Sequence, residues 1–420
     1  MQFISMSLLY YTGIRLYHLM VFLASLFNEK AREFIRGRKG LFSHLEENTA
    51  GWDQTVWFHC ASLGEFEQGR PLIEEMKARD PGLKILLTFF SPSGYRIRKD
   101  YSHADYVTYL PVDTPSNARR LVELLQPEKV FFIKYEYWYF LLRELHGQDI
   151  PVFLVSAIFR KEQVFFRWYG GWFRKMLHDY RQIFVQDDAS RQLLLQYGIT
   201  HVAVSGDTRF DRVRKISRNA TTLPLIEKFR GDELLVIGGS TWPGDEELLI
   251  RYYKESGHSF KMILAPHEVY EQNIQRLSAA FDTREVVIWS GAHVENIPQA
   301  RVLIIDVVGL LSALYGYGNL AFIGGGFGKG IHNILEAATH GLPVIFGPNH
   351  QKFKEALDLK SREAAFSVSN FSEFRELMDS LFADRRQIRT SGKTARFYVE
   401  ENAGATTRIL NFLTVRVINS

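Results

Sequence analysis

The sequence predicts an α/β protein with two parallel-sheet domains, and three observations support this class. From about residue 55, short apolar segments alternate with helix-sized segments, which is typical of parallel strands covered by helices. A polar stretch near residues 214–231, with Pro224 inside it, divides these strands into two series. The chain has 420 residues, of which 46% are hydrophobic and 23% charged, and this is enough for two separate cores.

Seven strands are expected in each domain. They are VWFHCAS, KILLTFF, YVTYLP, KVFFIKY, PVFLVS, QIFVQD and VAVSGD in the first domain, and LLVIGGS, KMILAPH, VVIWSG, VLIID, LAFIGGG, PVIFGP and AFSVS in the second. Ligands bind at the carboxyl ends of parallel strands, so the loops after these strands are expected around a common cleft between the domains. A helical tail over residues 384–413 is expected to cross back onto the first domain.

The N-terminal segment differs from the rest of the chain. Residues 3–27 are dominated by Leu, Phe, Tyr, Met and Val, are interrupted by Arg15 and His18, and precede a basic stretch at residues 30–39. A spanning helix would place Arg15 near mid-bilayer at a cost of roughly 2.5 to 3.5 kcal/mol, so a helix inserted in one leaflet is favoured. A secretory signal fits less well, because no charged region precedes the apolar run. A buried first helix is the remaining alternative.

Composition excludes several classes of function. A formal net charge of +4 is too small for this length to indicate nucleic-acid binding, and no basic run is interleaved with aromatic residues. Cys60 is the only cysteine, so an intramolecular disulfide and a cysteine-based metal cluster are excluded, and a reducing compartment is favoured.

The segment Leu320–Pro348 predicts the phosphate-facing half of a nucleotide-sugar site. An apolar strand runs into glycines, an Asn-initiated helix, a Gly-Leu-Pro stop and a second strand, and helix N-terminal amides attract phosphate. A Walker A loop is rejected because Gly330 follows Gly328-Lys329 where Ser or Thr is required. The dinucleotide pattern also fails, because Lys329 takes the place of its third glycine.

Two acidic residues at predicted helix starts have two interpretations each. Glu65 follows the first strand, where it could accept a proton from an attacking hydroxyl, but its spacing from Ser62 is also that of a capping box. On spacing alone the cap is favoured. Asn333 and Glu336 can likewise be a capped helix start, or Glu336 can hold ribose hydroxyls while the helix end meets phosphate.

Four motifs together resemble the 3-deoxy-D-manno-octulosonic acid (Kdo) transferases of lipopolysaccharide synthesis. They are ASLGEFEQGRPLIEEM at 61–76, SGDTRFD at 205–211, GGSTWPGDEEL at 238–248 and GGGFGKGIHNILEAATHGLPVIFGP at 324–348. The N-terminal apolar segment and its basic end are also similar to that family's membrane anchor. The resemblance spans most of the chain and implies a GT-B fold with two Rossmann-like domains, CMP-Kdo as donor and a lipid A precursor as acceptor.

The resemblance also implies roles for particular residues. The family's catalytic carboxylate falls on Glu65, which reverses the preference for a simple cap, and a second acidic position falls on Glu136. A family lysine becomes Arg209, which keeps the charge but alters its geometry. The implied donor contacts are Pro266 and His267, then Val308, Gly309 and Leu310, and then Asn333, Ile334, Leu335 and Glu336. In this set His267 replaces an arginine and Ile334 a proline.

The implied reaction is an inverting, metal-independent transfer of Kdo to lipid IVA, with Glu65 as general base. No cofactor is expected. His332, Glu336 and His340 have the spacing of one helix face but are expected to be a solvated or capped face rather than a metal site. The partners are CMP-Kdo, the lipid A precursor and the cytoplasmic face of the inner membrane. The alternatives are another nucleotide-sugar enzyme, such as a UDP-sugar transferase or epimerase, and a non-catalytic membrane-surface binding protein.

The expected domain organisation has four parts. They are a membrane-anchor helix with its basic flank at 1–40, an acceptor domain at 41–217, a CMP-Kdo donor domain at 218–395 and a C-terminal helix at 396–420.

Overall fold

The computed structural model describes residues 2–219 and 222–417 and divides into two compact units. Unit 1 contains the described residues up to Asp211 together with those from Gly404 on, and unit 2 contains Arg212–Ala403. The first division lies six residues before the expected boundary at 217/218, and the second lies eight residues after the expected boundary at 395/396. Helix α10, Thr208–Arg218, contains the first division, because its last residues belong to unit 2.

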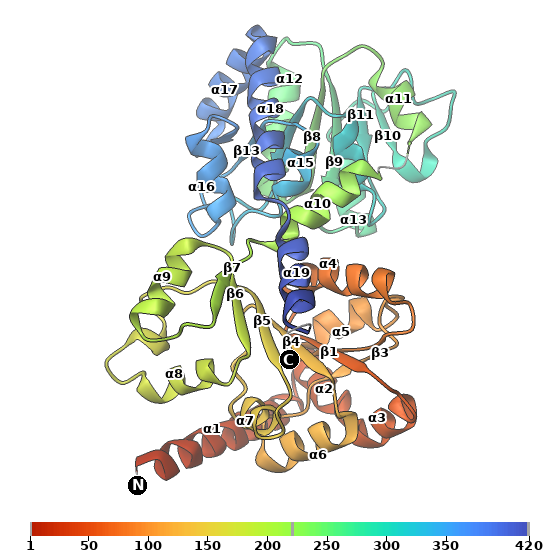
Figure 1. The fold of residues 1–420 in the computed structure, drawn as a ribbon. Helices are drawn as coiled ribbons and strands as arrows, with labels where there is room; N and C mark the ends of the chain where they lie inside the picture. Colours follow the sequence, from red (N-terminus) through yellow and green to blue (C-terminus); the bar gives the residue numbers. More distant parts are fainter. Residues whose placement is uncertain (1, 220–221, 418–420) are drawn as a thin grey trace. The chain divides into compact units, whose positions relative to one another are not determined.

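Unit 1 is built on a seven-stranded parallel sheet with the order β3-β2-β1-β4-β5-β6-β7 (Figure 1). The strands are β1 Thr55–Cys60, β2 Lys84–Phe89, β3 Tyr106–Tyr109, β4 Lys129–Ile133, β5 Val152–Ala157, β6 Gln182–Val185 and β7 Val202–Val204. The chain order reverses between β1 and β4, and such a reversal opens a crevice at the carboxyl ends of an open parallel sheet.

Alternating side chains build a separate core on each face of this sheet. Trp57 belongs to the core on one face, whereas its neighbour Phe58 belongs to the core on the other, as the two-residue repeat of a strand requires. The first core is covered by α3 Leu41–Thr49, α6 Pro115–Leu125, α7 Tyr139–Gly147, α8 Gly171–His178 and α9 Asp188–Gln196. The second is covered mainly by α4 Leu63–Arg79 and α19 Ala405–Val417, while α5 Pro92–Arg98 lies beside β2 and β3.

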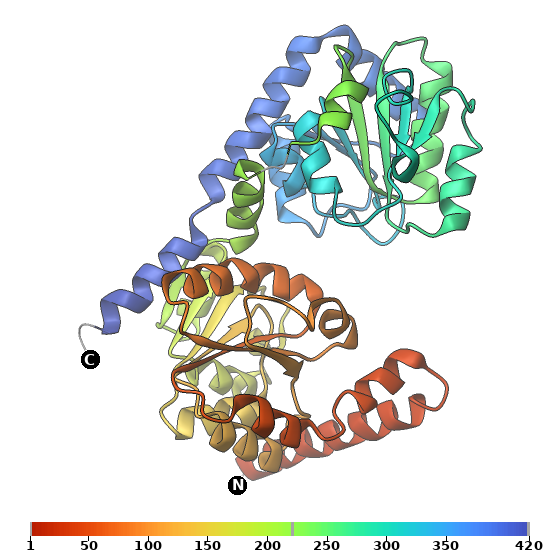
Figure 2. The same cartoon turned by 90° about the vertical axis from the view of Figure 1, so that its right-hand side faces the viewer.

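The N-terminal helix α1, Gln2–Ala24, lies on the surface of unit 1 beside α2, Glu29–Arg36 (Figure 2). Tyr10 attaches α1 to the unit, because its hydroxyl donates to Asp113 at 2.7 Å and its ring packs on Trp172. None of the residues from Met6 to Ala24 is buried, so the alternative of a buried first helix is wrong. Over the described residues, no helix is both long and apolar enough to cross a membrane.

Unit 2 has a second seven-stranded parallel sheet, with the order β10-β11-β9-β8-β12-β13-β14. Its strands are β8 Leu235–Thr241, β9 Lys261–Pro266, β10 Val286–Ile288, β11 Val302–Ile304, β12 Leu320–Ile323, β13 Val344–Phe346 and β14 Ala365–Ser367. Its helices are α11 Pro224–Arg230, α12 Pro243–Glu255, α13 Glu271–Ser278, α14 Leu311–Leu314, α15 Leu335–Thr339, α16 Lys354–Ser361, α17 Phe371–Ala383 and α18 Arg385–Asn402. The order here reverses between β8 and β12.

Some of the described non-glycine residues with positive φ lie at the carboxyl ends of strands. Lys134 directly follows β4, Ser156 lies near the end of β5 and Ser240 lies near the end of β8, and their φ angles are 75°, 57° and 52°. The strand pairing is irregular at both serines, which is the sign of a β-bulge. Non-glycine residues seldom adopt positive φ except where the surrounding structure enforces it, and such residues cluster at functional sites.

Candidate active site

The first loop at the carboxyl edge of unit 1 presents Glu65. This residue lies in the first turn of α4, five residues after β1, and is half-buried. The hydroxyl of Ser62 donates a hydrogen bond to the Glu65 carboxylate and accepts none from the helix amides. Ser62 and Glu65 therefore interact through their side chains, and the reciprocal capping box that their spacing allows is not formed.

Glu136 follows β4, the strand next to β1, and its side chain is only 2% exposed. It accepts a hydrogen bond from Trp138 Nε1 at 2.5 Å, and its Oε2 lies 3.1 Å from Nε2 of the fully buried His59. That second contact is at ion-pair distance, although the ring nitrogen does not meet hydrogen-bond geometry. Nδ1 of His59 lies 2.9 Å from the hydroxyl of Thr88, so strands β1 and β2 both hold this carboxylate in place.

The two carboxylates both raise the pKa of one buried thiol, that of Cys60. Cys60 is the last residue of β1, and burial raises the pKa of its thiol well above the usual value. Glu136 and Glu65 add to this rise, in that order, because each negative charge disfavours a thiolate nearby. The structure thus brings these two predicted residues to the same edge of the sheet, at the point where the strand order reverses.

Arg209 lies in the first turn of α10, after β7, and is tied to its neighbour Asp207. Its Nε and Nη2 lie 2.8 and 2.7 Å from one Asp207 oxygen, and the backbone amide of Arg209 donates to the other oxygen. The hydroxyl of Thr208 donates to the backbone oxygen of Gln68, about one turn after Glu65 in α4. The start of α10 is therefore fixed against the helix that presents Glu65.

In unit 2, the glycine-rich segment after β12 packs backbone against backbone. A Cβ added at Gly324 would lie 2.2 Å from the oxygen of Ser240, and one at Gly326 would lie 2.5 Å from the nitrogen of Gly347. One oxygen of the buried Asp245 accepts from the amides of Gly325 and Trp242, both at 2.9 Å. These glycines are thus required by the interlocking of the loops themselves.

Three rings from three loops stack beside this glycine segment. His267 follows β9, and its ring lies 4.3 Å from that of His332 and 4.8 Å from that of Trp242. Trp242 Nε1 donates to Nε2 of His332 at 3.0 Å, which places the proton of a neutral His332 on Nδ1. Burial, followed by the neighbouring His267, lowers the pKa of His332 to about 4. Of the three, only His267 is among the predicted donor residues.

The segment from Asn333 to Glu336 is shorter as a helix than expected. Helix α15 begins at Leu335 and has five residues, so the expectation of a helix that starts at Asn333 is wrong. Asn333 is exposed, and it accepts from the amide of Leu335 at 3.1 Å and donates to Glu336 at 3.0 Å. Ile334 and Leu335 are buried. A helix of five residues also has a smaller dipole than the expected one.

His332, Glu336 and His340 do not form the expected helix face. His332 precedes α15 and His340 is its C-cap, so the segment is not one continuous helix. Among the described residues, no group of three or more His, Cys, Asp or Glu side chains is arranged to hold a metal ion.

The other predicted donor residues lie on neighbouring loops of unit 2. Pro266 is the last residue of β9, and the His267 amide donates to the backbone oxygen of Thr241 at 2.9 Å. Val308 is 86% exposed in the loop before α14, Gly309 has a φ of 94°, and Leu310 is half-buried.

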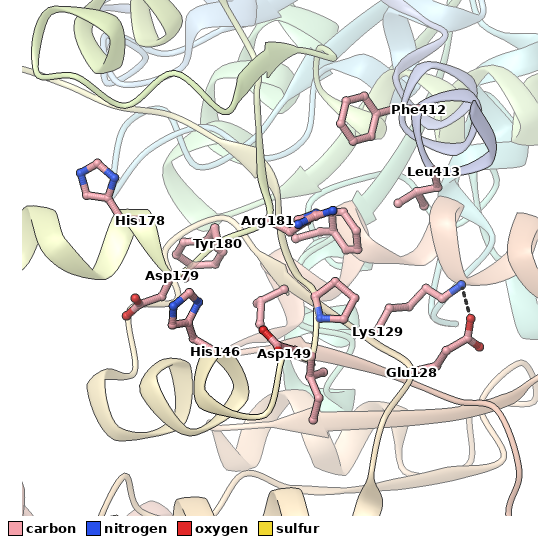
Figure 3. Close-up of a pocket in the computed structure, with 14 residues that line it drawn as sticks. Glu128, Lys129, His146, Asp149, His178, Asp179, Tyr180, Arg181, Phe412 and Leu413 are labelled. Atoms are coloured by element: carbon pink, nitrogen blue, oxygen red, sulfur yellow. Dashed lines mark ion pairs between the residues drawn. The ribbon is translucent and has the colours of Figure 1, made fainter. Parts of the chain in front are cut away.

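One pocket of unit 1 lies away from this edge. It has a volume of about 570 Å³ and lies at the amino-terminal ends of β4, β5 and β6, where Phe412 and Leu413 of α19 close one side (Figure 3). Lys129 and Glu128 form an ion pair across its rim, and none of the predicted site residues lines it. Ligands of open parallel sheets bind at the opposite, carboxyl edge, so the candidate site is taken to be the loops there.

Two Rossmann-like units with polar loops at the carboxyl edges of their sheets define the GT-B class of nucleotide-sugar proteins. Residues 33–212 match the family model described as 3-deoxy-D-manno-octulosonic-acid transferase. The curated enzyme of that name from Aquifex aeolicus is 27% identical over 81% of this chain and 89% of its own length, and the one from Haemophilus influenzae is 24% identical over 86% of each. The chain is similar to these glycosyltransferases over most of its length.

Solved structures support the fold alone. UDP-GlcNAc 2-epimerase from Neisseria meningitidis, bound to UDP-GlcNAc, superposes with a TM-score of 0.60 at 17% identity, over 86% of this chain and 99% of that one. MurG from Acinetobacter baumannii superposes with a TM-score of 0.54 at 13% identity, over 86% and 99%.

Sequence reasoning found both carboxylates but missed Trp242, His332 and His59 as site residues. The only sequence signal for Trp242 is its position in the loop after β8, and the only signal for His59 is its position within β1. For His332 the sequence predicted a solvated or capped helix face rather than a metal site, and no contact with Trp242 was expected.

Proposed function

We propose that this protein transfers Kdo from CMP-Kdo to a lipid A precursor, lipid IVA, on the cytoplasmic face of the inner membrane. Its similarity to the transferase family supports the sugar, and the relatives' printed names support the reaction type. The observation on which the mechanism rests is the carboxylate pair, Glu65 and Glu136, on loops of adjacent strands where the strand order reverses.

Glu65 acts as the general base. It deprotonates a sugar hydroxyl of the acceptor, which attacks the anomeric carbon of Kdo from the face opposite CMP, and the configuration there is inverted. The half-buried position supports this role, because the carboxylate is reachable from the loop edge yet partly shielded from water. The Ser62 hydroxyl orients the carboxylate by donating to it.

Glu136 supports the transition state from a fixed position. Trp138, His59 and Thr88 hold it within a buried network, so it needs little reorganisation when positive charge develops at the sugar ring during transfer. Its side chain is too deeply buried to be the base that meets the incoming acceptor.

The donor contacts are assigned to unit 2, and Arg209 is assigned a supporting positive charge. The CMP contacts are Pro266 and His267, the backbone of Val308, Gly309 and Leu310, and the segment Asn333, Ile334, Leu335 and Glu336. Because α15 is short, Lys329, exposed at the tip of the glycine loop, is assigned more of the phosphate stabilisation than helix amides alone would supply. Arg209 adds less than an unpaired arginine would, because Asp207 already neutralises it in part.

Helix α1 brings the enzyme to its lipid acceptor. Its surface carries large apolar side chains that are half or more exposed, among them Leu8, Leu9, Leu16, Leu19, Met20, Phe22 and Leu23. Water-exposed apolar side chains in such a row are typical of a helix whose outer face enters one leaflet, with basic residues at the headgroups.

The test is mass spectrometry of products from purified protein, CMP-Kdo and tetraacylated lipid A precursor. The acceptor should gain the mass of Kdo, and CMP should be released. Replacement of Glu65 by Gln should lower turnover by about 10²- to 10⁴-fold, the usual contribution of a general base, while binding of CMP is retained. Glu67→Gln, two residues along the same helix, is the matched control. Undiminished turnover of the Glu65→Gln variant would contradict the assignment of the base.

The two alternatives give different results in the same assay. A UDP-sugar transferase or epimerase would release or convert a UDP-sugar and leave CMP-Kdo intact. A non-catalytic binding protein would give no product with either donor.

A further inference from the structure

A second pocket of unit 1 is lined by three basic side chains. It has a volume of about 200 Å³, and its walls are Arg15 and His18 of α1, Arg38 just after α2, and the residues Leu41, Phe42, Pro111, Val112, Thr114 and Asn117. These lining residues include no Asp or Glu. The pocket therefore collects positive charge without a carboxylate to balance it.

Arg38 is fixed as a permanent part of this pocket. Its guanidinium donates to the backbone oxygens of Leu110, Phe34 and Phe90 at 2.8, 3.1 and 2.8 Å, and it lies 3.6 Å from the ring centre of Phe34. Burial lowers the pKa of Arg38 to about 9. Backbone oxygens accept the hydrogen bonds of the Arg38 guanidinium and aromatic rings pack against it, but none of these groups carries a negative charge that would balance the arginine.

The positive charges of the pocket also affect His18. Burial lowers its pKa, and the charges of Arg15 and Arg38 lower it further. A second proton on His18 is thus disfavoured until an anion is present. No described carboxylate pairs with Arg15, and the tyrosine that anchors α1 here, Tyr17, stacks on Phe90 without offering a negative charge.

The pocket lies on the same edge of the sheet as the carboxylates. The guanidinium of Arg38 bridges Phe90, just after β2, and Leu110, just after β3. Neighbouring strands lie about 4.8 Å apart, so this cation is one to two strand spacings, about 5 to 10 Å, from the end of β1. Phe90 in turn packs on Trp138, which donates to Glu136.

The apolar side of the pocket's own helix faces outward. Leu16 and Leu19 lie next to Arg15 and His18 in sequence, and they are 55% and 51% exposed. A ligand that combines an anionic group with acyl chains would meet both features at once, whereas a small soluble anion would use only the charges.

We propose that the Arg15–His18–Arg38 pocket binds a phosphate monoester group of a membrane lipid. This inference rests on the proposed function, and it deepens it by placing a phosphate of the acceptor about one or two sugar units from the hydroxyl at Glu65. Arginine binds phosphate oxygens through paired, charge-assisted hydrogen bonds, and three cations suit a monoester better than a singly charged diester.

The experiment measures binding of full-length protein to vesicles without any sugar donor. Phosphatidylcholine vesicles contain either phosphatidic acid, a phosphate monoester, or phosphatidylglycerol, a diester, at matched surface charge. The wild type should prefer phosphatidic acid. The double variant Arg15→Gln/His18→Gln should bind those vesicles about tenfold more weakly and lose the preference, because it loses paired hydrogen bonds to phosphate. Arg38 is left intact because its hydrogen bonds hold three chain segments together.

The matched control is Lys30→Gln/Lys39→Gln, which removes two exposed charges outside the pocket. It should weaken binding to both vesicles equally and keep the preference. A preference that survives in Arg15→Gln/His18→Gln, or that is absent from the wild type, overturns the proposal. Inorganic phosphate should compete weakly, and abolition of the preference by low concentrations of it would assign the pocket to a soluble anion instead. Since no donor is present, a failed transfer assay would leave this result standing.

Discussion

Buried ionisable side chains in this protein are held by specific partners rather than by solvent. Glu136 has Trp138 and His59, and His332 has Trp242. The surroundings of His332 favour its neutral form, so this residue makes a contribution to stability that depends on pH.

His332 allows this dependence to be tested. Its folded pKa is about 4, below the value near 6.5 of an unfolded histidine. Between pH 6.5 and 4, His332 is protonated in the unfolded chain but stays neutral in the folded protein. The contribution of His332 to the free energy of unfolding is therefore complete above pH 6.5 and is lost as the pH falls toward 4. After a discount for partial exposure, the loss is on the order of 1 to 2 kcal/mol.

Calorimetry of the wild type and His332→Gln across this range should show the wild type's advantage shrinking as pH falls. His293→Gln, at an exposed histidine of the same unit, is the control and should show no such trend. A constant difference between wild type and His332→Gln at every pH would refute the depressed pKa.

The motifs and the strand pattern predicted that Glu65 and Glu136 each follow a strand. Glu65 and Glu136 follow adjacent strands, and the structure places them at one edge. The Trp242–His332 hydrogen bond was not predictable, because it joins side chains 90 residues apart whose meeting depends on which strands are neighbours. The assigned roles of the site residues stay predictions.

At the scale of single elements, α1 combines two tasks on one helix. Tyr10 and Tyr17 attach it to unit 1, while Leu16, Met20 and Leu23 are each more than half exposed on its outer side. Deleting the whole helix would remove both features together, so substitutions of the outer side chains test membrane binding more cleanly.

The triple variant Leu16→Asp/Met20→Asp/Leu23→Asp should lose membrane attachment. If each side chain gains about 1 kcal/mol from partial burial in lipid, the partition coefficient should fall at least 100-fold. Sedimentation with vesicles measures this, and circular dichroism checks the fold. Ile97→Asp, at a residue 52% exposed on α5, should leave attachment unchanged. Undiminished sedimentation of the triple variant would point to another attachment surface.

Helix ends were less predictable than helix positions. Asn333 has the residue type of an N-cap, but its side chain bonds to the amide two residues on, and the helix begins later. Similarly, the strand expected through Gly291 ends at Ile288, where a short 3₁₀ turn begins. Local hydrogen bonds of this kind compete with regular structure, and a periodic pattern does not reveal them.

At the scale of the whole molecule, the chain leaves unit 1 and returns to it. Asp211, where it leaves, accepts hydrogen bonds from the amides of Gly404 and Thr406, where it returns. Ile409 and Leu410 of α19 then join the core on the α4 face of the sheet. The returning helix is therefore an integral part of unit 1.

Ile409→Ala should destabilise unit 1 selectively. A fully buried isoleucine replaced by alanine costs about 2 to 5 kcal/mol through lost contacts and the cavity left behind. If calorimetry resolves two transitions, only that of unit 1 should move to lower temperature. Asn411→Ala, at an exposed neighbour, should move neither. A shift confined to unit 2 would contradict the assignment of α19.

The strand pattern was sufficient to predict both sheets, because fully buried parallel strands are continuous apolar runs separated by helices. The strand orders were not predictable from it, because the pattern does not state which strand pairs with which. The point of reversal, which places the site, had to come from the structure.

The interlocked glycines of unit 2 have a consequence for how donor preference can vary. Gly324, Gly326 and Gly347 leave no space for even a methyl group, so this part of the loop is already ordered before any ligand arrives. Binding there has little chain entropy to lose. Variation among related enzymes would then be confined to the exposed tip, Gly328 and Lys329. A Cβ added at Gly328 makes only an ordinary contact, 3.6 Å from the Gly325 oxygen, so a new side chain there can change the ligand without disturbing the frame.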